Sequence, residues 1–239
     1  MHGATHLLAT DLDGTLVGDK SSLQALLDFY GSQTYKVSLV YITGRHYQSA
    51  LSLIEEESLP VPDVLITDVG TGIYIGDHLE PDLEWTRRLE KSWMPEKIES
   101  IASRVSGLTS QDLPITNRCS YFASDSTVVE AFRSELNKSG IPYKLIYSGG
   151  RDVDILPSES GKGQALQYIL DKYKLSEAKL LVAGDSGNDV EMLTMGFPSV
   201  IVGNAQPELL EQAEHPSIYR AKQKFAGGIH EAWSHFHTD

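Results

Sequence analysis

The chain has 239 residues and a formal net charge of −13, with 41% hydrophobic and 22% charged residues. This length is sufficient for one large or two medium domains with a proper core. The acidic balance argues against a nucleic-acid or anionic-membrane partner, because both require a basic surface. The single cysteine, Cys119, excludes an internal disulfide and a zinc site built from cysteines.

The sequence indicates neither a membrane span nor a signal peptide. No apolar run approaches the roughly 18 residues of a membrane-spanning helix. The first residues lack the charged and apolar regions of a signal peptide. We therefore expect a cytoplasmic protein without a membrane partner, and we expect it to be a monomer.

The first third of the chain alternates apolar strand-like segments with amphipathic helix-like ones, the pattern of βα units. The expected elements are a strand at 7–10, a helix at 22–30, a strand at 37–42, a helix at about 46–57, and strands at 64–67 and 73–75. Apolar runs bounded by turn residues are typical of the buried strands of a parallel sheet.

The character of the sequence changes near Pro81. From about 82 to 158 we expect a looser mixture, with strands at 118–124 and 144–147 and a helix at 127–138. The aromatic residues Trp85, Trp93 and Tyr121 are expected in the core of this segment rather than as platforms for a ligand.

The α/β alternation returns after this segment, with a helix at about 162–173 and strands at 180–183 and 200–202. We therefore predict an α/β protein whose core is a Rossmann-like, doubly wound parallel sheet. This core would be discontinuous, formed by 1–81 and 159–239. An α/β cap domain would be inserted at 82–158.

Two acidic residues follow the first expected strand. If the chain stays extended there, Asp11 and Asp13 point the same way. Ligands of open α/β sheets gather outside the carboxyl ends of the strands. Two crowded carboxylates repel each other unless a cation lies between them. The pair therefore indicates a Mg²⁺ site beside a carboxylate nucleophile, with an ordinary Asp-Gly turn as the alternative.

Two further polar groups also follow strand ends. Thr43, Gly44 and Arg45 come after the second strand, where a hydroxyl and free amides at a helix N-terminus can bind an anion. A simple helix cap by Thr43 is the alternative. Lys162 lies between two glycines and can bring its charge close to phosphate oxygens, although a solvated loop lysine is more common.

The strongest single signal is the stretch 184–189, Gly-Asp-Ser-Gly-Asn-Asp, which ends an apolar strand and precedes a helix. Asp185 can complete a shell of oxygen ligands with Asp11, while Asn188 and Asp189 lie one helical turn further on. A loop that only caps the next helix is the alternative. Because all these signals follow strands in the predicted sheet, we expect them to form one site.

In this order, Asp-x-Asp-Gly-Thr, Thr-Gly-Arg, a lysine and Gly-Asp-Ser-x-Asn-Asp resemble the motifs of the haloacid dehalogenase-like hydrolases. The insertion between the Thr-Gly-Arg helix and the lysine resembles their sugar-phosphatase branch with an α/β cap. Residues 43–50, 148–157 and 203–210 look like the sucrose-phosphate phosphatase family, and 219–221 and 226–229 fit its tail. The resemblance covers the whole chain.

The resemblance implies a Mg²⁺-dependent sugar-phosphate phosphatase that acts through an aspartyl-phosphate intermediate. Asp11 would attack phosphorus, and Asp13 would protonate the departing sugar oxygen and then activate water. The metal would be held by Asp11, the backbone carbonyl of Asp13 and Asp185.

The remaining site residues are assigned by the same resemblance. The phosphoryl oxygens would be bound by Thr43, Gly44, Lys162 and Asn188, of which Thr43 and Lys162 would take part in catalysis. Asp189 would orient Lys162 or a metal-bound water. The residues expected to contact the substrate's sugar are Arg45, Gln48, Arg151, Asp152 and Asp154.

The family resemblance favours sucrose 6-phosphate as the substrate and suggests sucrose-phosphate synthase as a partner. Mannosylfructose phosphate and glucosylglycerol phosphate are the nearest alternatives. Two other classes stay open: a phosphohexomutase that returns the phosphoryl group to the sugar, and a non-catalytic phospho-receiver module. Asp13, Lys162 and the inserted segment favour turnover over the receiver.

Overall fold

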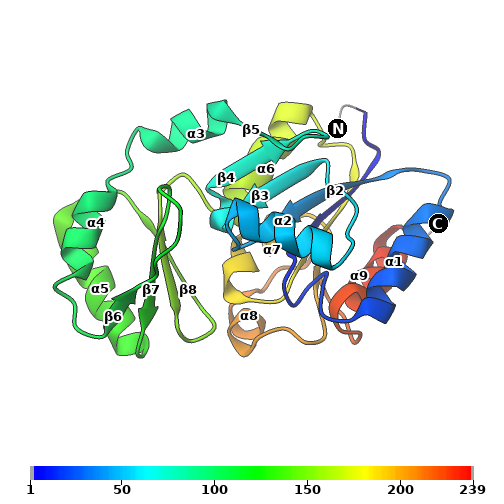
Figure 1. Ribbon diagram of the computed structural model, residues 1–239. Coiled ribbons are helices and arrows are strands. Elements are labelled where there is room, and N and C mark those ends of the chain that lie inside the picture. Colours follow the sequence, from blue (N-terminus) through cyan, green and yellow to red (C-terminus); the bar gives the residue numbers. More distant parts are fainter. Residues whose placement is uncertain (1–2, 238–239) are drawn as a thin grey trace.

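A computed structural model describes residues 3–237, which form a large sheet with helices on both faces and a smaller sheet beside it (Figure 1). The strands of the large sheet, in spatial order, are β12 (Ile218–Arg220), β11 (Ser199–Ile201), β10 (Lys179–Gly184), β1 (His6–Thr10), β2 (Val37–Ile42), β3 (Val64–Thr67), β4 (Gly72–Ile75) and β5 (Glu80–Pro81). The strands from β12 to β3 are parallel, and β4 and β5 extend one edge antiparallel.

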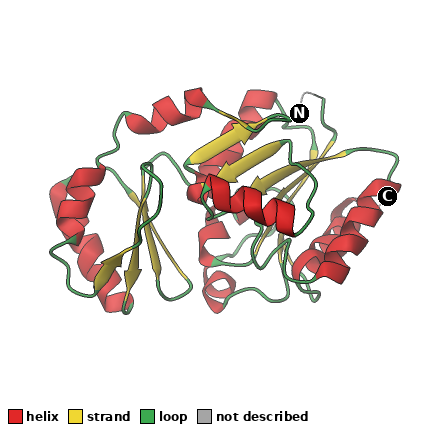
Figure 2. Cartoon of the chain, in the orientation of Figure 1, coloured by secondary structure: helices red, strands yellow, loops and turns green. Residues whose placement is uncertain are grey.

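Helices cover both faces of the large sheet (Figure 2). One face packs against α1 (Lys20–Ser32), α2 (Tyr47–Glu56) and α9 (Phe225–His237). The other packs against α3 (Leu83–Glu90), α6 (Lys162–Tyr173), α7 (Val190–Leu193) and α8 (Pro207–Gln212). Successive strand side chains point to opposite faces, so Leu8 joins the first cluster while Leu7 and Ala9 join the second. This arrangement confirms the predicted α/β fold with a parallel-sheet core.

The smaller sheet is antiparallel and has helices on one face only. Its strands, in spatial order, are β6 (Leu108–Ser110), β7 (Cys119–Ala123), β9 (Asp152–Leu156) and β8 (Lys144–Ser148). Its helices are α4 (Pro95–Ala102) and α5 (Ser126–Ser139). Tyr121 and Val153 are paired across β7 and β9 and lie in the apolar cluster with these helices. Their neighbours Ser120 and Asp154 are also paired and point to the opposite face, which is therefore polar.

The prediction that Trp85 lies in the core of the inserted segment is wrong. Its side chain is 1% exposed and belongs to the apolar cluster of the large sheet. The indole Nε1 donates a hydrogen bond to the carbonyl of Gly70 (3.2 Å). Trp93 and Tyr121 do pack in the cluster of the small sheet, as predicted. Helix α3 thus covers the large sheet.

Four strands (β5, β6, β9 and β12) and several helices, among them α3 and α9, escaped the sequence analysis. Strand β9 carries aspartates at alternate positions, so its apolar residues do not form the continuous run that marks a buried strand. Within 3–237, none of the helices combines the length and apolar character that crossing a membrane requires.

Candidate active site

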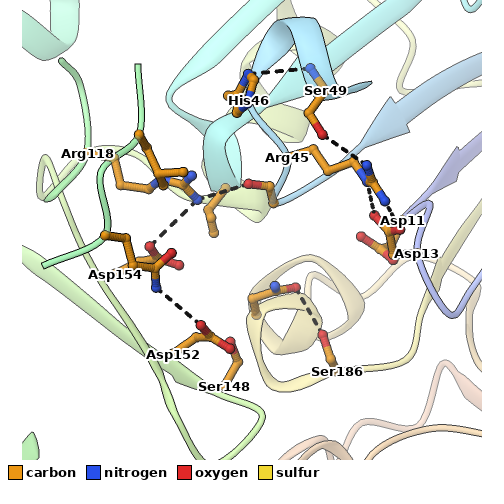
Figure 3. Close-up of a pocket in the computed structure, with 15 residues that line it drawn as sticks. Asp11, Asp13, Arg45, His46, Ser49, Arg118, Ser148, Asp152, Asp154 and Ser186 are labelled. Carbon is orange, nitrogen blue, oxygen red and sulfur yellow. Dashed lines mark hydrogen bonds and ion pairs between the residues drawn. The ribbon is translucent and has the colours of Figure 1, made fainter. Parts of the chain in front are cut away.

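A cavity of about 430 Å³ lies between the two sheets, and both contribute to its wall (Figure 3). Asp11, Asp13 and Arg45 line it from the large sheet, at the carboxyl ends of β1 and β2. Asp152 and Asp154 line it from strand β9 of the small sheet. The cavity thus occupies the position where open α/β sheets bind ligands, with the polar face of the small sheet opposite.

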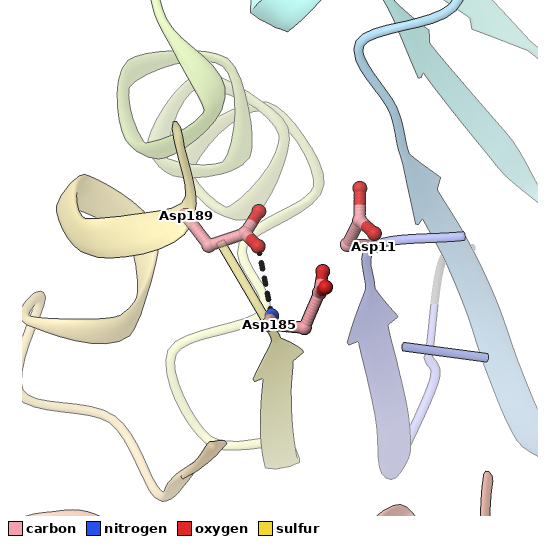
Figure 4. A group of neighbouring side chains, drawn as sticks. All are labelled: Asp11, Asp185 and Asp189. Atoms are coloured by element: carbon pink, nitrogen blue, oxygen red, sulfur yellow. Dashed lines mark hydrogen bonds between the residues drawn. The ribbon is translucent and has the colours of Figure 1, made fainter. Parts of the chain in front are cut away.

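Three buried aspartates meet at this edge of the large sheet (Figure 4). Strands β1 and β10 are parallel neighbours, with Thr10 opposite Ala183, so Asp11 and Asp185 leave the sheet side by side. Asp189 comes from the short turn η2 (Gly187–Asp189) that follows β10. One carboxylate oxygen from each aspartate lies within 4.8 Å of the others. The sequence prediction that Asp11 and Asp185 converge therefore agrees with the geometry.

Lys162 joins two of these aspartates. Its buried Nζ donates hydrogen bonds to Oδ1 of Asp11 (2.7 Å) and Oδ1 of Asp189 (2.6 Å). The other oxygen of Asp189 accepts the backbone N–H groups of Asp185 (2.9 Å) and Ser186 (3.0 Å). Both oxygens of Asp189 are thus used to hold the lysine and the turn, which supports its predicted role in orienting Lys162.

The charge balance of the cluster calls for an added cation. Burial, followed by the neighbouring Asp189, raises the pKa of Asp185 to about 6. Burial disfavours the charged form of Lys162, but Asp11 and Asp189 outweigh it and raise the lysine's pKa. One ammonium group therefore faces three carboxylates in a site screened from water, and a divalent cation would remove the excess negative charge.

The donor set fits a hard cation. The hydrogen bonds described for Asp11 and Asp185 use one oxygen of each, from Lys162 and from the Thr15 hydroxyl (3.1 Å). The second oxygen of each carboxylate is available to a metal ion. Carboxylate oxygens are the ligands that Mg²⁺ and Ca²⁺ prefer. The buried aspartate cluster can therefore hold a metal ion.

The loop after β2 is fixed by an unusual turn. The Thr43 hydroxyl accepts the backbone N–H of Arg45 (3.1 Å). Asp68 and Val69, in the turn η1 (Asp68–Gly70), both have left-handed backbones, with φ of 53° and 56°. Their N–H groups donate to the carbonyls of Arg45 (2.9 Å) and Thr43 (3.1 Å). A branched residue such as valine rarely adopts this conformation, so the surrounding structure holds strain that serves to position the loop.

Arg45 and Asp13 form a two-pronged ion pair. Nε of Arg45 lies 2.7 Å from Oδ2 of Asp13, and Nη2 donates to Oδ1 at 2.8 Å. The third nitrogen, Nη1, donates to the Ser49 hydroxyl (2.9 Å). Arg45 was predicted to contact the sugar, whereas here it holds the carboxylate predicted to act as acid and base.

The two predicted aspartates of β9 have defined partners. Asp154 is buried and accepts a hydrogen bond from the Ser120 hydroxyl (2.6 Å). Asp152 accepts one from Nε2 of Gln111 (3.2 Å). Both carboxylates line the cavity, as does Asn188 on the opposite wall. These three predicted residues are thus brought to the same space.

Gln48 and Arg151 are placed differently from the other predicted residues. Both are exposed, and neither is among the described residues that line the cavity. The guanidinium of Arg151 lies over the ring of Phe122, 3.8 Å from its centroid. A contact between either side chain and a sugar in this cavity would require a rearrangement.

Sequence reasoning missed several residues of the cavity wall. These are His46, Ser49, Val69, Gln111, Leu113, Arg118, Ser148 and Ser186. Arg118 and Ser120 did carry a signal, because polar residues at alternate positions around a strand mark a face turned away from the apolar core. The loop residues carry no such periodicity.

Comparisons with known proteins identify the family. The profile of the sucrose-6F-phosphate phosphohydrolase family matches residues 4–237. Mannosylfructose-phosphate phosphatase of Agrobacterium fabrum is 33% identical over 96% of both chains. Probable sucrose-phosphatase 1 of Arabidopsis thaliana is 37% identical over 96% of this chain and 59% of its own. Glucosylglycerol-phosphate synthase of Pseudomonas anguilliseptica is 35% identical over 96% of this chain and 30% of its own.

The chain thus spans only part of the length of two of these relatives. A solved structure matches nearly throughout: the sucrose-phosphatase of Synechocystis, determined in complex with sucrose and phosphate, has a TM-score of 0.91 and 37% identity over 98% of both chains. These similarities support the predicted class of phosphoric monoester hydrolase. The chain belongs to the sucrose-6F-phosphate phosphohydrolase family, as its motifs predicted.

Proposed function

We propose that the protein is a Mg²⁺-dependent phosphatase that hydrolyses sucrose 6-phosphate to sucrose and phosphate. One observation carries the proposal: Asp11 lines a cavity whose opposite wall is polar, and it is grouped with the buried Asp185 and hydrogen-bonded to the buried Lys162. The wall formed by the large sheet suits a phosphoryl group and a cation, and the polar wall formed by the small sheet suits sugar hydroxyls.

Asp11 is the proposed nucleophile. Its carboxylate lies at the end of β1 and borders the cavity, where one oxygen can approach phosphorus in line with the leaving oxygen. Lys162 fixes the orientation of this carboxylate through its 2.7 Å hydrogen bond. Attack would form an aspartyl phosphate and release the sugar alkoxide, which requires a proton.

Asp13 is the proposed source of that proton. It lines the same cavity two residues from Asp11 and would then accept a proton from the water that hydrolyses the acyl phosphate. The ion pair with Arg45 keeps its carboxylate turned toward the α2 side of the cavity. Arg45 must therefore release Asp13 for the transfer to occur.

Phosphoryl binding would involve the Thr43–Arg45 loop, Lys162 and Asn188. A bound Mg²⁺ would supply positive charge to the transferring phosphoryl oxygens, held by Asp11, Asp185 and the carbonyl of Asp13. These contacts are the same whichever sugar carries the phosphate. They therefore explain phosphatase activity but not the choice of substrate.

The sugar would lie against strand β9 and its neighbours. Asp152, Asp154 and Gln111 offer acceptors and donors at fixed positions, because each already has a protein partner. Fixed polar groups discriminate between sugars by leaving an unpaired group when a hydroxyl is misplaced. The relatives named for mannosylfructose phosphate and glucosylglycerol phosphate make these two compounds the alternative substrates.

A phosphate-release assay over a panel of sugar phosphates, with and without Mg²⁺, tests the proposal. We expect Mg²⁺-dependent release with sucrose 6-phosphate giving the highest kcat/KM. A higher value for mannosylfructose or glucosylglycerol phosphate would replace the substrate and keep the mechanism. An isomerised sugar without free phosphate would indicate a mutase, and stable phosphorylation without turnover would indicate a receiver module.

A further inference from the structure

Arg118 is a buried cation at the seam between the two sheets. It immediately precedes β7, and only 6% of its side chain is exposed. Its Nη1 donates a hydrogen bond to the carbonyl of Gly44 (3.0 Å), in the loop after β2 of the large sheet. A residue of the small sheet thus reaches across the cavity to the proposed phosphate-binding loop (Figure 3).

Two buried carboxylates flank the same guanidinium. Nη2 lies 3.6 Å from Oδ1 of Asp68, in the strained turn that supports the Thr43–Arg45 loop. Nη1 lies 3.6 Å from Oδ1 of Asp154, on the wall proposed to face the sugar. Arg118 therefore contacts two elements. On one side lies the turn that supports the proposed phosphate-binding loop, and on the other lies the wall proposed to face the sugar.

The guanidinium has unused bonding capacity. Both ion pairs are longer than hydrogen bonds, and among the described residues Nε of Arg118 and Oδ1 of Asp68 have no hydrogen-bond partner. A small further approach of the two sheets can therefore shorten these contacts. Attraction between charges is stronger in a site screened from water. Shorter contacts would therefore stabilise the arrangement in which the two sheets lie closer together.

Other contacts across the seam are more accessible to solvent. Lys144 of β8 pairs with Glu191 of α7 at 2.6 Å, with 24% and 35% of their side chains exposed. The N–H of the exposed Gly149 donates to Oε1 of Glu208 (3.0 Å). Because these groups are partly exposed, water and salt screen their contacts more than those of Arg118. Arg118 is therefore placed to hold Asp154, on the wall proposed to face the sugar, against the Thr43–Arg45 loop.

We propose that Arg118 is a positioning residue that joins the sugar wall at Asp154 to the phosphate-binding loop at Gly44, so that the two ends of a sugar phosphate are held together. The inference rests on the proposed function. It predicts that Arg118 matters for a ligand that spans both walls and matters little for phosphate alone. Among the described residues, no hydrogen bond or ion pair joins Arg118 to Asp11, Asp13 or Lys162.

The test compares two measurements in the Arg118→Met variant. The kcat/KM for the preferred sugar phosphate should fall at least about thirtyfold, the scale for breaking a buried charged pair. The inhibition constant of inorganic phosphate, which has no sugar, should change by less than about threefold. Arg118→Lys should recover part of kcat/KM, because its ammonium can still reach the Gly44 carbonyl without bridging both carboxylates.

Arg133→Met is the matched control. Arg133 lies on α5, is 41% exposed and pairs with Glu130 one helical turn away (3.3 Å), so both measurements should match those of the wild type. A parallel loss of kcat/KM and phosphate affinity in Arg118→Met would overturn the positioning role, and so would an unchanged kcat/KM. A wild-type protein that hydrolyses no sugar phosphate would instead refute the proposed function.

A second variant covers the case in which Arg118→Met does not fold, which its thermal unfolding reveals. Asp68→Asn keeps the shape of the turn and weakens the ion pair to Arg118. We expect kcat/KM for the sugar phosphate to fall about three- to tenfold, with phosphate inhibition unchanged. An Asp68→Asn enzyme with wild-type kcat/KM, together with no loss in Arg118→Lys, would contradict the proposal.

Discussion

Arg45 and Asp13 are joined by two nearly equal contacts, 2.7 Å from Nε and 2.8 Å from Nη2. This parallel geometry fixes the plane of the carboxylate oxygens. A group that must give a proton to a leaving oxygen cannot do so while both its oxygens accept from a guanidinium. Arg45 therefore positions the proposed acid and base at the cavity, and the leaving oxygen of the substrate must replace one of these two contacts.

A double-mutant cycle tests whether Arg45 acts through Asp13. Asp13→Asn should lower kcat about 10²–10⁴-fold, the usual contribution of general acid–base catalysis. Arg45→Met should lower it about tenfold to a hundredfold, because Asp13 loses its orientation. The double variant should be no slower than Asp13→Asn alone. Multiplied losses would mean that Arg45 acts independently, as a sugar-binding residue would.

Metal dependence tests the buried aspartate cluster. A chelator should abolish phosphate release and added Mg²⁺ should restore it. Asp185→Asn should raise the Mg²⁺ concentration for half-maximal activity at least about tenfold, because losing even an outer partner of a metal costs this much. Asp152→Asn is the control: it lies across the cavity, so KM for the sugar phosphate should rise while the Mg²⁺ requirement stays the same. An unaltered Mg²⁺ requirement in Asp185→Asn would remove this residue from the metal site.

Gly70 lies where two loops of the site meet. It has φ of 95°, and a Cβ at this position would collide with the backbone of Gly161 and Lys162. Gly70→Ala should lower the free energy of unfolding by about 2 kcal/mol or more and should reduce kcat, because Lys162 must shift. Gly76→Ala is matched in backbone conformation, with φ of 80°, but its Cβ meets open space. Equal effects on kcat in both variants would contradict the role of the close contact.

Asp82 joins α3 to α6 and should give a pH-dependent contribution to stability. Its side chain caps α3 and lies 2.6 Å from Nζ of Lys172. Burial alone would raise the pKa of Asp82, but the hydrogen bonds from Lys172 and Trp85 outweigh it and lower the pKa. A lowered pKa means that the stabilisation is complete above the ordinary value and is lost as pH falls through the folded value.

Urea unfolding of the wild type and the Asp82→Ala variant at several pH values measures this pH-dependent contribution of Asp82 to stability. At pH 7 the variant should be less stable by about 1–2 kcal/mol, as for other lost helix caps. The difference should narrow below pH 3.8, the ordinary pKa of the group, where wild-type Asp82 becomes protonated. A gap that stays constant down to pH 3 would show that the charge of Asp82 has no part in it.

Much of the catalytic side could be predicted because it follows local rules. Strands β2 and β3 coincide with their predicted ranges, and Asp11 and Asp185 follow strands that are parallel neighbours. In such a sheet, position along the chain fixes position in space, so motifs at strand ends converge. The family and the fold class followed from the same motifs and are confirmed.

The cap side could not be predicted in the same way. The wall proposed to face the sugar comes from β7 and β9. These strands pair antiparallel over a separation of more than thirty residues along the chain, as in the Ser120–Asp154 contact. Trp85 was misplaced because helix α3, which carries it, was not predicted, and position along the chain alone does not reveal which of the two sheets Trp85 contacts. Arg118 escaped notice because its role depends on Gly44 and Asp68, 74 residues away in the first case.

Chemical trapping of the phosphorylated enzyme tests the account most directly. Acid quenching of the wild type during turnover of its preferred sugar phosphate, followed by borohydride reduction, converts an aspartyl phosphate to homoserine, which peptide mass spectrometry locates. We predict homoserine at position 11, and none in the Asp11→Asn variant, which should also release no phosphate. Continued phosphate release by Asp11→Asn, or a modification at another residue, would contradict the central claim.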